Sequence, residues 1–119
     1  MVMGYDISLY KVPAELKDQY INDDVLFDIA YGNDYQNCLL VDTNFSMGNP
    51  KSIDFATVFD IMLTNNDFFK IYKILDFNEA INRLRTMSLD DVLLERINKF
   101  LNVIEQELNK GELIFFCCG

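Results

Sequence analysis

The sequence has no histidine, and it contains only two prolines, five glycines and three cysteines in 119 residues. The absence of histidine excludes Ser-His-Asp triads, histidine general bases and histidine-containing zinc sites. The glycines are too widely spaced to form a phosphate-binding loop. The motifs of serine hydrolases and of calcium loops are also absent from the sequence. We therefore expect that this protein is not an enzyme and that it binds no cofactor and no metal ion.

The three cysteines do not form a disulfide framework or a metal motif. Cys38, Cys117 and Cys118 are odd in number and lack CxxC spacing, so they are interpreted as small apolar residues of the core. The N-terminus lacks the basic and apolar regions of a signal peptide, and no stretch approaches 18 uncharged apolar residues. These features predict a cytoplasmic protein with no membrane association.

Acidic residues outnumber basic residues, mostly in the first half of the chain. The formal net charge is −9, and the stretch from Asp18 to Asp67 holds nine acidic residues and one lysine. Such a field repels nucleic acid and anionic lipid and attracts a basic protein or a metal cation. The charge thus predicts a basic protein partner and no nucleic acid, although solubility alone is a simpler explanation of an acidic composition.

The length fits one domain, residues 1–119, and half of the residues are hydrophobic. Alternating apolar residues predict a strand from Gly4 to Val12. Pro13 is well placed to begin a short helix to about Ile21, which would bury Leu16 and Tyr20. Asn22 can cap a further helix at about 24–31, and Gly32 can end it.

The middle of the chain is less clearly patterned. A short apolar run at 38–41 favours a strand, residues 43–51 have the composition of a loop, and a helix is expected from Ser52 to about Thr64. The segment Phe68–Leu75 fits both a helix and an alternating strand, and we favour the helix. Asp76 or Asn78 can cap another helix after it.

The C-terminal third carries the strongest pattern. Ser88 resembles the start of a capping box, and an amphipathic helix of about 20 residues then runs to Lys110 and Gly111. The run at 113–118 is apolar on both faces, which predicts a covered central strand beside the first strand. The expected fold class is α+β, with a small sheet that contains both terminal strands and is packed by several helices. The core is expected to include Tyr5, Ile7, Leu9, Ile97, Phe100, Leu101, Ile104, Ile114 and Phe116.

The two ends of the chain carry a resemblance to known families. The opening MGYDISLYKV and the ending KGELIFFCCG resemble small bacterial proteins that begin on a strand and finish with a long helix and a strand. These include the acidic immunity proteins of contact-dependent toxin systems and the YfbM-like family. The resemblance to immunity proteins implies a protein that binds a cognate toxin domain, often a basic nuclease, and blocks it.

The helix expected at 24–31 offers a candidate surface for such a partner. At 100° per residue, Asp24, Asp28 and Tyr31 fall on one side of this helix. The opposite side is occupied by Val25, Leu26, Ile29 and Ala30. Carboxylates can bind Arg and Lys through charge-assisted hydrogen bonds, and tyrosine supplies rigid contact area. The predicted partner-binding residues are Asp23, Asp24, Asp28, Tyr31, Asp34 and Tyr35. The predicted function is a cytosolic immunity protein that neutralises a basic toxin domain; the alternative is an acidic adaptor or regulatory domain with another partner.

Overall fold

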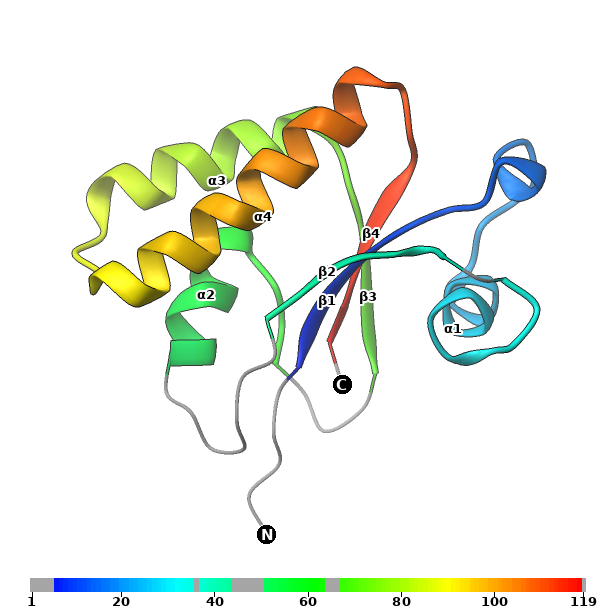
Figure 1. The fold of residues 1–119 in the computed structure, drawn as a ribbon, viewed down its shortest axis with the longest axis horizontal. Helices are drawn as coiled ribbons and strands as arrows, with labels where there is room; N and C mark the ends of the chain where they lie inside the picture. Colours follow the sequence, from blue (N-terminus) through cyan, green and yellow to red (C-terminus); the bar gives the residue numbers. More distant parts are fainter. Residues whose placement is uncertain (1–5, 36, 44–50, 64–66, 119) are drawn as a thin grey trace, which may run out of the picture.

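Both terminal strands lie in the middle of a four-stranded antiparallel sheet (Figure 1). The computed structural model describes residues 6–35, 37–43, 51–63 and 67–118. The sheet order is β2-β1-β4-β3, with β1 at Ile7–Lys11, β2 at Leu39–Asp42, β3 at Phe68–Tyr72 and β4 at Ile114–Cys118. The predicted α+β fold with a sheet containing the N- and C-terminal strands is confirmed.

The central position of β4 follows from its sequence. All five of its residues are buried, as expected for a strand covered on both faces. It pairs with β1, placing Leu9 opposite Phe116, and with β3, placing Ile71 opposite Phe115. The prediction that the last strand pairs beside the first is confirmed.

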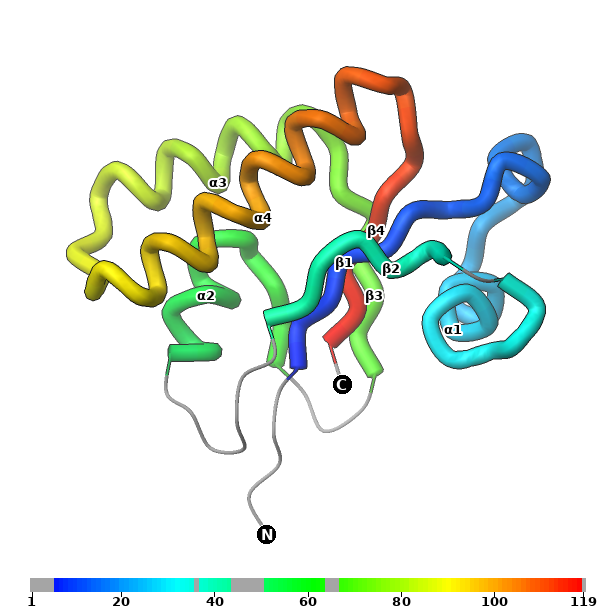
Figure 2. The backbone as a smooth tube through the Cα atoms, in the orientation of Figure 1, coloured from blue at the N-terminus to red at the C-terminus, as the bar shows by residue number. Residues whose placement is uncertain are grey.

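Three helices cover one face of the sheet, and a fourth lies on the other side. Figures 1 and 2 show α2 (Lys51–Phe59), α3 (Ile74–Thr86) and α4 (Asp91–Asn109) together on one side, which we call the helical face. Helix α1 (Asp23–Tyr31) lies on the opposite side, which we call the α1 face. The apolar residues of β1, β3 and β4 are therefore divided between two separate clusters, one on each face of the sheet.

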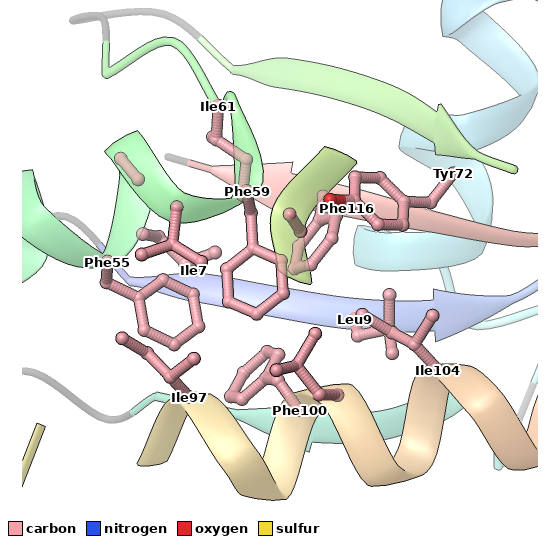
Figure 3. Close-up of a cluster of buried hydrophobic side chains, with 14 of the residues drawn as sticks. Ile7, Leu9, Phe55, Phe59, Ile61, Tyr72, Ile97, Phe100, Ile104 and Phe116 are labelled. Carbon is pink, nitrogen blue, oxygen red and sulfur yellow. The ribbon is translucent and has the colours of Figure 1, made fainter. Parts of the chain in front are cut away.

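The larger cluster joins α4 to the sheet on the helical face. Figure 3 shows Ile97, Phe100 and Ile104 of α4 pointing towards the strands that carry Leu9 and Phe116. All the predicted core residues that the structure describes belong to this cluster. The remaining predicted core residue, Tyr5, lies outside the described residues.

The smaller cluster lies on the α1 face. Leu26 and Ile29 of α1 are buried there with Phe115 and Cys117 of β4. The predicted caps of this helix are confirmed, because the side chain of Asn22 accepts a hydrogen bond from the Val25 N–H at 3.0 Å and α1 ends before Gly32.

The favoured helix at Phe68–Leu75 is wrong, because its first part is strand β3. This segment supplies β4 with its second partner. Lys70 is tolerated on the helical face because its ammonium group lies 3.3 Å from the Asp60 carboxylate and 3.8 Å from that of Asp76. Helix α3 starts at Ile74, where the Lys73 N–H donates to Asp76 Oδ2 at 2.8 Å. The predicted N-caps, Asp76 and Asn78, are therefore both wrong, because both residues lie inside the helix. The N-cap is Lys73.

The helix expected from Pro13 to Ile21 is reduced to one 3-10 turn, Ala14–Leu16. Leu16 is buried as predicted, but Tyr20 is 85% exposed. Ile21 packs against the same cluster as Leu16 in its place. Leu16 and Ile21 are five residues apart, and residues at this spacing do not share a face of a helix. A continuous helix could therefore not bury both of these side chains in one cluster.

Two helix boundaries in the second half also differ from the prediction. Helix α2 ends at Phe59, because Asp60 adopts φ of 55° and the Ile61 N–H bonds back to the Ala56 carbonyl at 2.9 Å. The predicted end, Thr64, lies outside the described residues. Helix α4 is capped by Asp90, whose carboxylate accepts the Leu93 N–H at 2.8 Å, and not by Ser88. Most of the predicted loop at 43–51 is also outside the described residues.

Candidate functional site

Helix α1 presents carboxylates to solvent and its apolar side to the sheet. Asp23, Asp24 and Asp28 are exposed, while Leu26 and Ile29 are buried. Val25 and Ala30, on the same side as the buried pair, are half-buried. The predicted orientation of the acidic and apolar sides of this helix is confirmed.

The end of α1 depends on a close backbone approach at Gly32. Its N–H donates to the Asp28 carbonyl at 2.8 Å. A Cβ atom at this position would lie 2.5 Å from the same carbonyl oxygen, closer than van der Waals contact allows. Glycine therefore fixes where the helix ends and, with it, the position of Tyr31 beside the sheet.

Tyr31 is oriented differently from the prediction. Its side chain is 48% exposed, but the hydroxyl points to the sheet instead of outward with the carboxylates. The hydroxyl donates to Asp67 Oδ1 at 3.1 Å and lies 3.2 Å from the Sγ atom of Cys117. The expectation that Tyr31 faces solvent together with Asp24 and Asp28 is thus correct for part of its ring and wrong for its hydroxyl.

The last two predicted site residues follow α1. Asp34 is exposed, whereas Tyr35 is half-buried and packs against the cluster on the α1 face. The structure therefore brings Asp23, Asp24 and Asp28 together on one helix, with Asp34 on the adjoining segment. Tyr35 contributes to the packing beneath this surface.

Two aromatic residues that were not predicted to belong to the site lie near Tyr31: Phe27 contacts Tyr31, and Phe69 contacts Phe27. The ring of Phe27 lies 4.9 Å from that of Tyr31 and 6.5 Å from that of Phe69 in β3, measured between centroids. We call Phe27, Tyr31 and Phe69 the aromatic strip. The spacing of Phe27 and Tyr31, four residues apart on one helix, was a usable signal. Nothing in the sequence placed Phe69 beside them.

The thiol beneath Tyr31 does not have the environment of an activated nucleophile. Burial raises the pKa of Cys117, the Tyr31 hydrogen bond opposes this effect, and the charges of Asp67 and Asp42 raise the pKa further. Burial and the contacts with Cys117 and Asp67 also raise the pKa of Tyr31. Both groups are protonated at neutral pH, whereas a reactive cysteine requires the thiolate.

The free energy of unfolding is expected to fall as the pH rises from about 9 to about 11. Burial raises the pKa of Cys118 from its ordinary value of 9.0 to about 11, so the unfolded chain loses this proton at a lower pH than the folded protein does. The contribution of the protonated Cys118 thiol to the free energy of unfolding is fully present below pH 9 and is lost as the pH rises through about 11. Urea unfolding at pH 8, 10 and 11 measures the decline. The variant Cys118→Ala should decline less, and an equal decline in both proteins would contradict the assignment.

One hollow in the surface formed by the described residues adjoins the acidic residues. A cavity of about 460 Å³ lies at the start of α1 and is lined by residues 20–24. Another, of about 480 Å³, lies against α2 and Arg83 of α3. Within the described ranges, no three cysteine or carboxylate side chains are grouped so that they could hold a metal ion. None of the helices formed by the described residues has both the length and the apolar character needed to span a bilayer.

No protein-family model, curated protein or solved structure matches this chain.

Proposed function

We propose that this protein is a cytoplasmic immunity protein that binds and neutralises a basic bacterial toxin domain, such as a nuclease, through the acidic surface of α1. The observation that carries the proposal is the display of Asp23, Asp24 and Asp28 on the exposed side of one helix, next to the exposed ring of Tyr31. The resemblance of the two ends of the chain to immunity proteins supports it. The protein acts by binding and catalyses no reaction itself.

Electrostatics favour a basic protein over other partners. The stretch from Asp18 to Asp67 holds nine acidic residues and one lysine, so its field attracts Arg and Lys side chains and repels nucleic acid and anionic membranes. A toxin that cleaves nucleic acid must carry a basic cleft for its substrate. Carboxylates that bind the cationic side chains of that cleft compete with the phosphates of the substrate.

The test is to find a toxin partner and to protect cells from it. The tagged protein is used to capture basic proteins from its native host, and each captured protein is expressed in bacteria with and without this chain. The proposal expects growth arrest by the partner alone and recovery on co-expression. Asp24→Lys/Asp28→Lys should protect poorly, and Glu95→Lys/Glu105→Lys, with the same charge change on exposed positions of α4, should protect normally.

Two outcomes would overturn the proposal. If the captured proteins are not toxic, the acidic surface serves another partner, as the adaptor hypothesis states. If both double variants protect equally well, the surface of α1 is not the binding site.

A further inference from the structure

We infer that the aromatic strip of Phe27, Tyr31 and Phe69, with the Asp67 carboxylate beside it, receives an arginine side chain of the basic partner. The inference rests on the proposed function and adds to it the chemistry that the partner must present. It extends the contact surface from the carboxylates of α1 to the sheet edge formed by β3.

The strip is exposed apolar surface in an acidic part of the molecule. Phe27 and Tyr31 are 46% and 48% exposed, and their ring centroids lie 4.9 Å apart. Phe69 is half-buried, and Asp67 and Asp28 are exposed. Aromatic residues framed by charged residues are typical of the energetically important centres of protein interfaces.

Two of the three rings of the strip, Tyr31 and Phe69, are held in place before any partner binds. Hydrogen-bond contacts to Asp67 and Cys117 fix the Tyr31 hydroxyl. Phe69 packs against Phe115 at 6.3 Å, and Phe115 stacks on Tyr10 at 5.5 Å. A partner that binds here loses little free energy to ordering these side chains, because their positions are already fixed.

The combination of ring faces and carboxylates selects arginine over lysine. A guanidinium group is planar and weakly hydrated, so it stacks on aromatic rings and donates two parallel hydrogen bonds to a carboxylate. The lysine ammonium group is compact and strongly hydrated, and its attraction to carboxylates does not depend on flat neighbouring surfaces. Acidic residues alone would bind both cations, so a preference for arginine is the property that the strip adds.

The experiment compares two probes, a nine-residue polyarginine peptide and a nine-residue polylysine peptide, by calorimetry at 0.15 M salt. We expect the protein to bind polyarginine about fivefold more tightly, and the preference to disappear in Phe27→Ala. The control is Tyr20→Ala, which removes another exposed aromatic ring, 85% exposed and beside the acidic start of α1. It should keep the preference. Circular dichroism checks that both variants are folded.

Equal binding of the two peptides by the unaltered protein, or an unchanged preference in Phe27→Ala, would overturn the inference. These outcomes are distinguishable from failure of the proposed function. If the protein protects cells from a toxin but shows no preference for arginine, the aromatic strip has no role and the acidic surface of α1 remains the proposed binding site. An arginine preference without any toxic partner supports the strip and removes the immunity function.

Discussion

Replacing Phe100 with alanine is expected to lower the free energy of unfolding by about 3–5 kcal/mol. Phe100 is 1% exposed and lies in the middle of the larger core cluster. Its ring centroid is 4.7 Å from that of Phe55 and 6.1 Å from that of Phe116, on which it stacks. The truncation removes the Phe100 contacts with α2 and with the centre of the sheet, and it leaves a cavity that the surrounding strands cannot easily fill.

Urea unfolding followed by circular dichroism measures the effect. Val92→Ala is the matched control, because Val92 belongs to the same helix and is 55% exposed, and its free energy of unfolding should change by less than about 0.5 kcal/mol. Ile104, another buried residue of α4, should give a loss of about 2–5 kcal/mol when truncated to alanine. Unchanged midpoints for Phe100→Ala and Ile104→Ala would mean that α4 does not pack on the sheet.

Reversing two charges on α1 is expected to slow association with a basic partner about tenfold at low salt. Asp24→Lys/Asp28→Lys turns an attractive surface into a repulsive one at positions that are exposed and not part of either core cluster. Long-range attraction acts mainly on the encounter of the two proteins, so the dissociation rate should change less. For the unaltered protein, the association rate should also fall as ionic strength rises.

Stopped-flow or surface-based kinetics with the captured partner measure both rates. The control is again Glu95→Lys/Glu105→Lys, which applies the same change in net charge far along the chain on α4. If both double variants slow association equally, net charge and not the α1 surface determines the rate. An association rate that does not vary with salt would mean that the acidic residues do not attract the partner. Solubility would then be a sufficient explanation of the acidic composition.

The parts of the fold with a single consistent pattern could be predicted from the sequence. Helix α4 repeats apolar residues at helical spacing over 19 residues, and β4 is apolar at every position. Each of these patterns fits one kind of element and one kind of environment. The apolar run of β4 indicated a covered strand inside the sheet, but it does not itself identify β1 as the neighbouring strand.

The prediction of a helix at Phe68–Leu75 was wrong because the segment fits both the helical and the strand periodicity. Phe68 and Tyr72 are four residues apart and also lie on the same face of a strand, so the apolar pattern does not separate the two. In the strand, Lys70 lies on the helical face, where an unpaired charge would be costly. The two carboxylates that neutralise it, Asp60 and Asp76, are brought to it by the tertiary structure, which the sequence does not display.

The candidate site also has a part that could be predicted from local sequence and a part that could not. The exposure of Asp23, Asp24 and Asp28 followed from helical geometry, because it depends on residues within one turn or two. The contacts of Tyr31 with Asp67 and Cys117 join positions 36 and 86 residues apart. Local periodicity carries no information about such contacts, so the direction of the hydroxyl and the presence of Phe69 could be learned only from the packing of α1 on the sheet.

The position of the two terminal strands also determines when the protein can fold during its synthesis. Of the four strands of this sheet, β1 comes first in the chain and β4 comes last, yet these two are neighbours at the centre of the sheet. Among the described residues, β3 is paired with β4 alone, so it too must wait. β1 can pair early with β2, which places Val41 opposite Leu9. At roughly 5–20 residues per second, however, β4 is synthesised on the order of ten seconds after β1. The sheet can therefore be completed only once β4 has been synthesised, because β4 is the strand that joins β1 to β3.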